Sequence, residues 1–161
     1  MNDTISKSAI SIALYQPDIP QNTGTILRMA ACLDLHAHII EPCGFALNDR
    51  TLRRAGMDYL DRSTYTKHLS WSHFLEWTES ESRRLVLATT KASHAFTDLD
   101  YLPNDILLFG RESVGVPENV HERADERITI PMREGERSLN LAISTAMVAS
   151  EALRQLKAFP S

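Results

Sequence analysis

Short apolar runs recur along this chain and alternate with stretches of helical spacing. Five such runs lie at 9–15, 36–40, 84–90, 105–110 and 127–131, and polar or proline- and glycine-containing loops follow them. Continuous apolar runs of this length are typical of strands that are buried on both faces of a sheet. Because helices between strands permit parallel pairing, the sequence predicts an α/β fold, a mostly parallel sheet flanked by helices.

Helical patterns occupy the stretches between these runs. The first begins at Asn22, where Asn22 or Thr23 can cap it; shorter helices are predicted at 48–56 and 71–79. The longest pattern covers 139–159, and Ser138 or Asn140 starts it. With 161 residues, the chain is expected to form a single domain over 1–161.

The composition is that of an ordinary globular protein, with 43% hydrophobic and 24% charged residues. No apolar run approaches the roughly 18 to 20 residues of a membrane span, and the first residues lack the pattern of a signal peptide. We therefore expect a cytoplasmic protein. Cys32 and Cys43 have no CxxC spacing, which argues against a disulfide framework or a zinc site, and both thiols are expected to be buried.

The net charge of −4 argues against a protein that binds nucleic acid nonspecifically by neutralising many phosphates. The charge is unevenly distributed, however. Residues 47–68 carry five Lys and Arg against three acids, whereas residues 98–126 carry eight acids against two Arg. The five basic residues are Arg50, Arg53, Arg54, Arg62 and Lys67. They form either a local cationic face or an ordinary solvated helix surface.

Ligands of open α/β sheets gather at the carboxyl ends of strands, so the loops after the predicted strands are candidate sites. In residues 22–28, NTGTILR, a glycine-containing turn lies at a helix N-terminus, where free N–H groups favour an anion. Arg28 follows about 1.5 turns into this helix. The alternative interpretation is an ordinary capped helix with an exposed arginine.

Two further loops carry candidate side chains. Residues 109–117, FGRESVGVP, follow a predicted buried strand, and their two glycines allow a ligand to approach the backbone closely. Glu112 in this loop is either a functional carboxylate or the partner of a neighbouring arginine. In residues 128–140, ITIPMREGERSLN, Ser138 is most simply a helix cap. Asn140 is expected inside the first helical turn, where asparagine is a poor helix former.

Several common catalytic and cofactor patterns are absent from the sequence. It contains no GxGxxG, GxxxxGK[ST] or GxSxG, so dinucleotide-binding, P-loop and serine-hydrolase interpretations have no support. The histidines do not form a spaced metal cluster, and no metal is expected. His36 and His38 lie two residues apart on a predicted strand, where a structural role is favoured.

The order of the three loop motifs is more specific than any one of them. The chain resembles the SPOUT RNA methyltransferases in their three motifs, which occur in the order NTGxxxR, FGxExxGxP and, before the last helix, IPMxxxxxSLN. The similarity extends through YQPDIPQNTGTILRMA, HIIEPCGF, LRRAGMDYLD and TTK, and so covers nearly the whole chain. This detail points to the minimal group of that superfamily, the TrmL-like tRNA (cytidine/uridine-34)-2′-O-methyltransferases.

The resemblance implies S-adenosylmethionine as cofactor and a C-terminal segment threaded into a deep trefoil knot. It also implies a homodimer with the active site across its interface. The implied active-site residues are Asn22, Arg28, Glu112, Ser138 and Asn140, and the implied cofactor contacts are Ala88, Gly110, Ile130, Ser138 and Leu139. Arg28 is expected to position the ribose hydroxyl or its phosphate rather than to remove a proton, because a guanidinium stays protonated.

The same resemblance makes tRNA the expected partner, with phosphate contacts from the five basic residues of 50–67. An apolar stripe of the last helix, Ala142, Ile143, Ala146, Met147 and Ala149, fits either a dimer contact or an intrachain core. Ser150 stands before Glu151, where close relatives often carry tyrosine.

Two other functions stay open at this point. A 2′-O-methyltransferase of the same superfamily that acts on ribosomal RNA or on another tRNA position shares these motifs. The ribosomal-RNA enzymes usually carry an extra N-terminal RNA-binding domain, whereas only eight residues precede the first predicted strand here. A non-catalytic RNA-binding or cofactor-sensing protein is the alternative from another class, and the complete set of motif residues argues against it.

Overall fold

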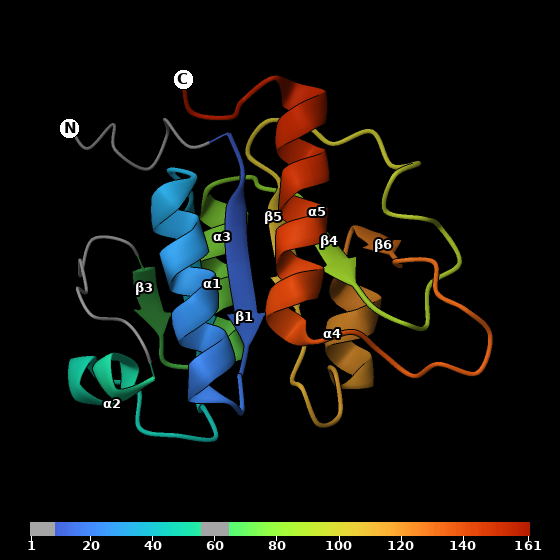
Figure 1. Cartoon of the computed structure of the whole chain (residues 1–161). Helices are drawn as coiled ribbons and strands as arrows, with labels where there is room; N and C mark the ends of the chain where they lie inside the picture. Colours follow the sequence, from blue (N-terminus) through green and yellow to red (C-terminus); the bar gives the residue numbers. More distant parts are fainter. Residues whose placement is uncertain (1–8, 56–64) are drawn as a thin grey trace.

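The computed structural model describes residues 9–55 and 65–161, and these form a parallel six-stranded sheet with helices on both faces (Figure 1). The strands are β1 (Ser11–Tyr15), β2 (His36–Ile40), β3 (Tyr65–His68), β4 (Leu85–Ala88), β5 (Ile106–Phe109) and β6 (Glu126–Ile128). Their order across the sheet is β3-β2-β1-β5-β4-β6, and every neighbouring pair is parallel. The predicted α/β class and the mostly parallel sheet are confirmed.

The helices are α1 (Pro20–Cys32), α2 (Asp49–Arg54), α3 (Trp71–Ser80), α4 (Glu118–Arg123) and α5 (Leu141–Leu156). α1 and α5 lie side by side on one face of the sheet, and α3 and α4 lie on the other (Figure 1). Within the described residues, no helix has both the length and the apolarity needed to cross a membrane.

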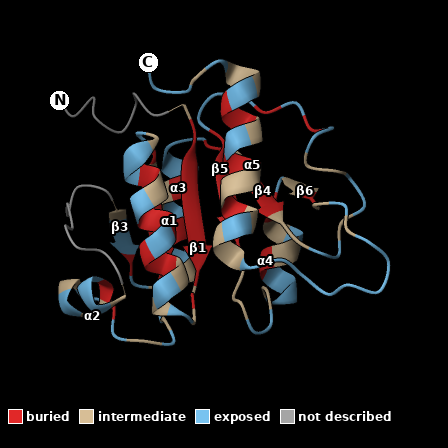
Figure 2. Cartoon of the chain, in the orientation of Figure 1, coloured by how far each residue is buried: buried red, intermediate tan, exposed pale blue. Residues whose placement is uncertain are grey.

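Alternate residues of the central strands point into two separate cores. In β1, Ile12 and Leu14 pack with side chains of α1 and α5, whereas Ala13 and Tyr15 pack with Phe74 of α3. Figure 2 shows the central strands β1, β4 and β5 buried between helices whose outer faces are exposed. Because the middle of the described sheet is filled in this way, the strand ends are where a ligand site is expected.

The strand order reverses between β1 and β5. The chain passes from β1 outward to β2 and β3, and then crosses to the other side of β1, where β5, β4 and β6 follow. The loop after β1 and the loop after β5 therefore diverge from two adjacent strands at the carboxyl edge. In open parallel sheets this switch point is the usual position of a ligand.

The start of α1 differs from the sequence expectation, and the start of α5 decides between the two residues expected there. α1 begins at Pro20, and Ile19 is its N-cap residue, so neither Asn22 nor Thr23 caps it. Proline has no N–H to satisfy and its φ suits the first helical position, which explains the earlier start. α5 is capped by Asn140, whose Oδ1 accepts from the backbone N of Ala142 and Ile143; Ser138 is not the cap.

Two elements and one cysteine were not predicted correctly. β3 is an edge strand with exposed central residues, and α4 has six residues, so neither carries a strong apolar period. Cys32 is exposed in the last turn of α1, contrary to the expected burial, and Cys43 is half-buried. The predicted cap of α2 is confirmed, since Asn48 Oδ1 accepts from Thr51 N at 2.9 Å.

Candidate functional site

A pocket of about 720 Å³ opens at the carboxyl ends of β4 and β5. Its walls come from residues 87–91 after β4, residues 109–116 after β5, residues 129–132 after β6, and residues 137–141 at the start of α5. Pockets for small molecules and cofactors span about 300 to 1,000 Å³. The three loop motifs of the sequence thus converge on one cavity of cofactor size.

The pocket brings together nearly all the residues expected to form the active site and the cofactor contacts. Each of the expected cofactor contacts lines it: Ala88, Gly110, Ile130, Ser138 and Leu139. Asn22, Glu112 and Asn140 also line it. Arg28 does not; it lies exposed on α1, one and a half turns beyond Asn22.

Glu112 accepts hydrogen bonds from the N-terminal end of α1. Its Oε1 accepts from Asp18 N at 2.9 Å, and its Oε2 accepts from Ile19 N at 3.2 Å and from Asn22 Nδ2 at 3.3 Å. The carboxylate thus satisfies donors at a helix start, where the helix dipole favours negative charge. Glu112 forms no salt bridge with an arginine of the described residues, so of the two alternatives considered for it, the ion pair with a neighbouring arginine is not observed.

A relay of side-chain amides connects α1 to α5. Asn140 Nδ2 donates to Asn22 Oδ1 at 3.1 Å, while Asn140 Oδ1 caps α5. Asn22 in turn donates to Glu112. Because each of these polar groups orients the next, the relay fixes the relative positions of three loops that are far apart in sequence.

Residues 110–115 form a tight hairpin, and its two glycines have distinct tasks. Arg111 and Gly115 exchange two backbone hydrogen bonds of 2.9 Å. A Cβ on Gly110 would lie 2.7 Å from the carbonyl carbon of Gly115, so only glycine fits there. Gly115 has a φ of +70°, in the left-handed region that favours glycine.

Asp18, which the sequence analysis did not select, joins the loop after β1 to this hairpin. Its Oδ1 accepts from Arg111 Nε at 3.1 Å and Nη2 at 2.6 Å, and its Oδ2 accepts from the backbone N and Oγ of Ser113. The Ser113 hydroxyl and the Arg111 guanidinium lower the pKa of Asp18. The sequence signal that could have identified Asp18 is an acidic residue shortly after the first strand and close to Asn22.

One lining residue carries a buried polar atom with no partner. His121 Nε2 is buried and has no hydrogen-bond partner among the described residues. A buried polar group without a partner is uncommon, and a ligand often satisfies it. The rim also carries three cationic side chains, Lys91, Arg111 and Arg137.

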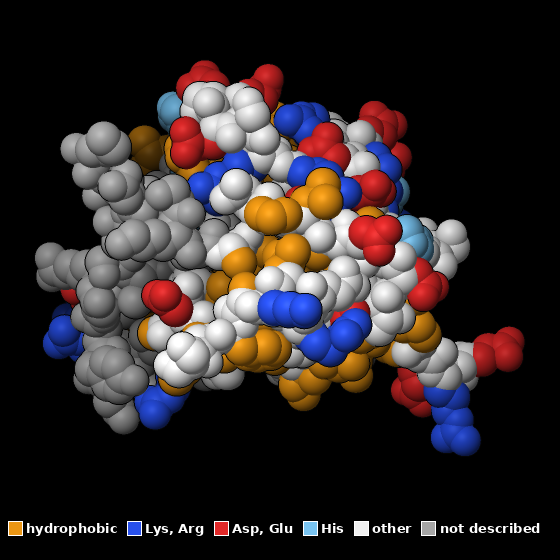
Figure 3. Space-filling view, turned by 90° about the horizontal axis from the view of Figure 1, so that it is seen from above, with side chains coloured by type: hydrophobic (Ala, Val, Ile, Leu, Met, Phe, Trp, Pro, Cys, Tyr) orange, Lys and Arg blue, Asp and Glu red, His pale blue; other side chains and the backbone are white. Residues whose placement is uncertain are grey.

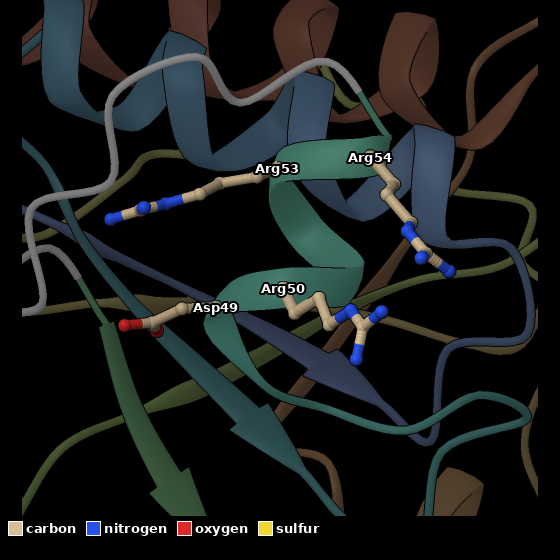
Figure 4. Close-up of a pocket in the computed structure, with 4 residues that line it drawn as sticks. All are labelled: Asp49, Arg50, Arg53 and Arg54. Atoms are coloured by element: carbon tan, nitrogen blue, oxygen red, sulfur yellow. The ribbon is translucent and has the colours of Figure 1, made fainter.

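The basic residues of 50–67 lie away from this pocket. Arg50, Arg53 and Arg54 are exposed on α2; Arg50 and Arg54 extend to one side of the helix, and Arg53 and Asp49 to the other (Figure 4). Lys67 is exposed on β3 and lines a shallow depression with Arg50. Arg62 lies outside the described residues. In the view from above (Figure 3), acidic, basic and hydrophobic side chains are interspersed over the described surface.

A second polar cluster lies between the β2–β3 edge and α3. His38 Nδ1 and His68 Nε2 are 2.9 Å apart, and His36 Nε2 is 2.7 Å from Thr66 Oγ1. Burial lowers the pKa of each of these three imidazoles, and most strongly that of His38. Within residues 9–55 and 65–161, no group of three or more His, Cys, Asp or Glu side chains is arranged to hold a metal ion.

Comparison with known proteins agrees with the three converging loops of this parallel α/β sheet. Residues 9–150 match the SpoU rRNA methylase family, to which this chain therefore belongs. The motif resemblance noted in the sequence is thereby confirmed.

Within and near this family, three proteins are particularly informative. The chain is 58% identical over 147 residues to a tRNA (cytidine(34)-2′-O)-methyltransferase of Beijerinckia indica, with 91% of this chain and 92% of that protein covered. A solved structure described by its work on 2-OH methylation of C/U34 on tRNA superposes with a TM-score of 0.86 at 38% identity, covering 94% and 98% of the chains. An AdoMet-bound rRNA methyltransferase of Sinorhizobium meliloti superposes with a TM-score of 0.81 at 26% identity, covering 91% of this chain and 56% of that one.

Proposed function

We propose that this chain transfers the methyl group of S-adenosylmethionine to the ribose 2′-hydroxyl of nucleotide 34 of a tRNA, a cytidine or a modified uridine. One observation carries the proposal: three motif loops converge on one pocket, in a chain 58% identical to an enzyme named for this reaction. We expect the reaction in the cytoplasm, with residues 1–161 acting as a single domain.

The residues present fit the proposed cofactor. The pocket of about 720 Å³ accommodates a molecule of this size. Its walls combine strand-end backbone with apolar side chains such as Ile130 and Leu139, and the unpartnered Nε2 of His121 offers a polar contact. The AdoMet-bound relative supports the same assignment.

When bound, S-adenosylmethionine supplies a methyl group on a positively charged sulfur. The chain's task is to hold the ribose hydroxyl in line with that group and to exclude competing geometries. Glu112, Asn22 and Asn140 use their polar atoms to fix the loops around the pocket. We therefore assign these three residues to positioning. Ser138, exposed at the pocket and not engaged as a helix cap, is available to contact the cofactor or the ribose.

Arg28 completes the site from a second subunit in this proposal. It projects from α1 outside the pocket of its own chain. Ile143 of α5 is 53% exposed, and Ile19, at the start of α1, is 40% exposed, which leaves apolar surface beside the site for a partner. Ala149 is fully buried, so the apolar stripe of α5 serves both the core and this surface.

Two features of the resemblance extend the proposal. The C-terminal segment that includes residues 129–140 and α5 forms a deep trefoil knot. The guanidinium groups of α2, with Lys67 and Arg62, contact tRNA phosphates. The exposure of the α2 arginines on a chain of net charge −4 supports a local cationic contact.

The first experiment is transfer of radiolabelled methyl from S-adenosylmethionine to bulk tRNA from a strain lacking this protein, with nuclease mapping of the labelled nucleotide. We expect 2′-O-methylated nucleotide 34 with the wild type, and a loss of at least about 100-fold with Arg28→Ala. Arg154→Ala, which removes an exposed arginine at the far end of α5, is the matched control and should retain activity. Methyl label in ribosomal RNA instead of tRNA would make ribosomal RNA the substrate. Binding of S-adenosylmethionine without any methyl transfer would favour a cofactor-sensing protein.

Mixing two inactive variants tests the composite site. Arg28→Ala and Glu112→Gln damage different halves of each site, so a mixed dimer contains one site with neither change. Random mixing should restore about a quarter of the wild-type sites. Activity no higher than that of the separate variants would contradict the placement of Arg28 in the partner's site.

A further inference from the structure

The hairpin of residues 110–115 forms one wall of the pocket and is held from behind by Asp18. Four donors of this hairpin converge on its carboxylate: Nε and Nη2 of Arg111, and the backbone N and Oγ of Ser113. Asp18 itself is not among the described residues that line the pocket. It therefore contacts the wall without reaching the space that a ligand fills.

The hydrogen bonds between the two loops run in both directions. Asp18 accepts from the hairpin through its side chain, while its backbone N donates to Glu112 Oε1 at 2.9 Å. The position of the hairpin relative to β1 is thus set by two carboxylates, one on each loop. Among the described residues, the backbone–backbone hydrogen bonds within the hairpin are the two between Arg111 and Gly115, and its tip residue Val114 is 74% exposed.

Asp18 is fixed on its other side by the loop after β2. Gly44 N donates to Pro17 O at 2.9 Å, and a Cβ on Gly44 would lie 3.0 Å from Asp18 Cα and 3.2 Å from its Oδ1. The backbone of residue 44 thus packs directly against Asp18. This support lets Asp18 act as a fixed point from which the hairpin is oriented.

The chemistry of the contact favours an ionised carboxylate. Arg111 donates two hydrogen bonds to one oxygen of Asp18, and Ser113 donates two to the other. Charge-assisted bonds of this kind are roughly twice as strong as neutral ones. A single exposed ion pair contributes little, whereas this carboxylate collects several donors and its side chain is only 19% exposed.

We propose that Asp18 is a positioning residue that holds the wall formed by residues 110–115 in the geometry required for binding S-adenosylmethionine. The inference rests on the proposed function for the identity of the ligand. It assigns Asp18 to cofactor affinity rather than to the methyl-transfer step.

The test compares Asp18→Asn with Asp18→Glu and with Asp98→Asn, an exposed acid outside the pocket. Amide hydrogen exchange of the ligand-free protein should accelerate in residues 110–115 of Asp18→Asn, with α5 unchanged. Calorimetry should show about a tenfold weaker Kd for S-adenosylmethionine, with KM rising in parallel and kcat nearly unchanged. Asp18→Glu should recover part of the affinity, and Asp98→Asn should match the wild type.

Ser113→Ala provides a milder second variant in case Asp18→Asn does not fold. It removes one of the four donors, and we expect about a threefold weaker Kd. Wild-type exchange and wild-type Kd in both variants would overturn the proposal, as would a fall in kcat at constant KM. Failure of the wild type to bind S-adenosylmethionine would instead overturn the proposed function, and hydrogen exchange would then decide the role of Asp18 alone.

Discussion

Two polar clusters of this molecule satisfy their hydrogen-bonding groups in opposite ways. At the carboxyl edge of β1 and β5, the carboxyl oxygens of Asp18 and Glu112 accept hydrogen bonds from donors on neighbouring loops. Beneath α3, His38 is 1% exposed, and its Nε2 has no hydrogen-bond partner among the described residues. The first cluster requires charge, whereas the second requires its absence. The comparison indicates that charge-assisted hydrogen bonds stabilise the site edge, whereas packing stabilises the histidine region.

Glu112→Gln is expected to disrupt the hydrogen bonds of the site edge most strongly. An amide offers one acceptor oxygen and brings an N–H₂ group against the backbone donors of Asp18 and Ile19. We expect at least about a 100-fold loss of kcat/KM for tRNA methylation and a loss of about 1 to 3 kcal/mol in the free energy of unfolding. Glu122→Gln, at an exposed position of α4 beyond its first turn, should change neither. Retained activity in Glu112→Gln would show that the loops keep their positions without this charge.

Acid should weaken the histidine region through His38. Burial, together with the charges of His36, His68 and Arg83, lowers its pKa, and His73 acts on His68 in the same sense. The unfolded chain therefore binds protons near the ordinary histidine pKa of about 6.5 while folded His38 stays neutral. Above about pH 6.5, neutral His38 therefore costs no free energy of unfolding. As the pH falls below this value toward the pKa of His38 in the folded protein, the free energy of unfolding decreases.

Urea unfolding at pH 7.5 and 5.5 measures this effect. Each unit of pKa difference is worth about 1.4 kcal/mol, so we expect the wild type to lose at least about 1 kcal/mol over this range. His38→Leu should lose less, because it has no buried imidazole to keep neutral. His94→Gln, at an exposed position, should follow the wild type. Equal pH slopes in all three proteins would remove His38 as the cause.

The mildest substitutions compare two helix-cap residues. Asn140 caps α5 and Asn48 caps α2, each through its side-chain oxygen, but only Asn140 also donates to Asn22. Alanine at either position should cost about 1 kcal/mol in the free energy of unfolding. Binding of S-adenosylhomocysteine, measured by calorimetry, should weaken several-fold in Asn140→Ala and stay unchanged in Asn48→Ala. Equal effects on binding would mean that the amide relay adds nothing to the cap.

The strands were predictable wherever burial left an apolar run. β2 (His36–Ile40) matches its predicted range, and β4 and β5 lie inside theirs. β3 was missed because Thr66 and Lys67 are exposed at the edge of the sheet, so its residues carry no strand-like pattern. Local periodicity therefore identified the interior of the sheet and missed its margin.

The motif resemblance indicated most of the polar residues that line the pocket, but it did not indicate their contacts. The partners of Glu112 are two backbone N–H groups and one side-chain amide, all at least 90 residues away, which no local pattern encodes. Asp18 was overlooked for the same reason, since its importance depends on the adjacency of β1 and β5. The alternative roles considered for Ser138 and Asn140 were resolved only by the observed start of α5.

The hydrogen bond between Asn22 and Asn140 spans 118 positions of the chain, and this has a consequence for protein synthesis. A ribosome that has released β1 to β6 has made two of the three motif loops, yet the pocket still lacks the wall contributed by residues 137–141. Contacts at such sequence separation form late and slow the folding of a domain. A nascent chain should therefore gain affinity for its methyl donor only after residues 137–141 have left the ribosome, so that ligand binding reports synthesis of the chain through the start of α5.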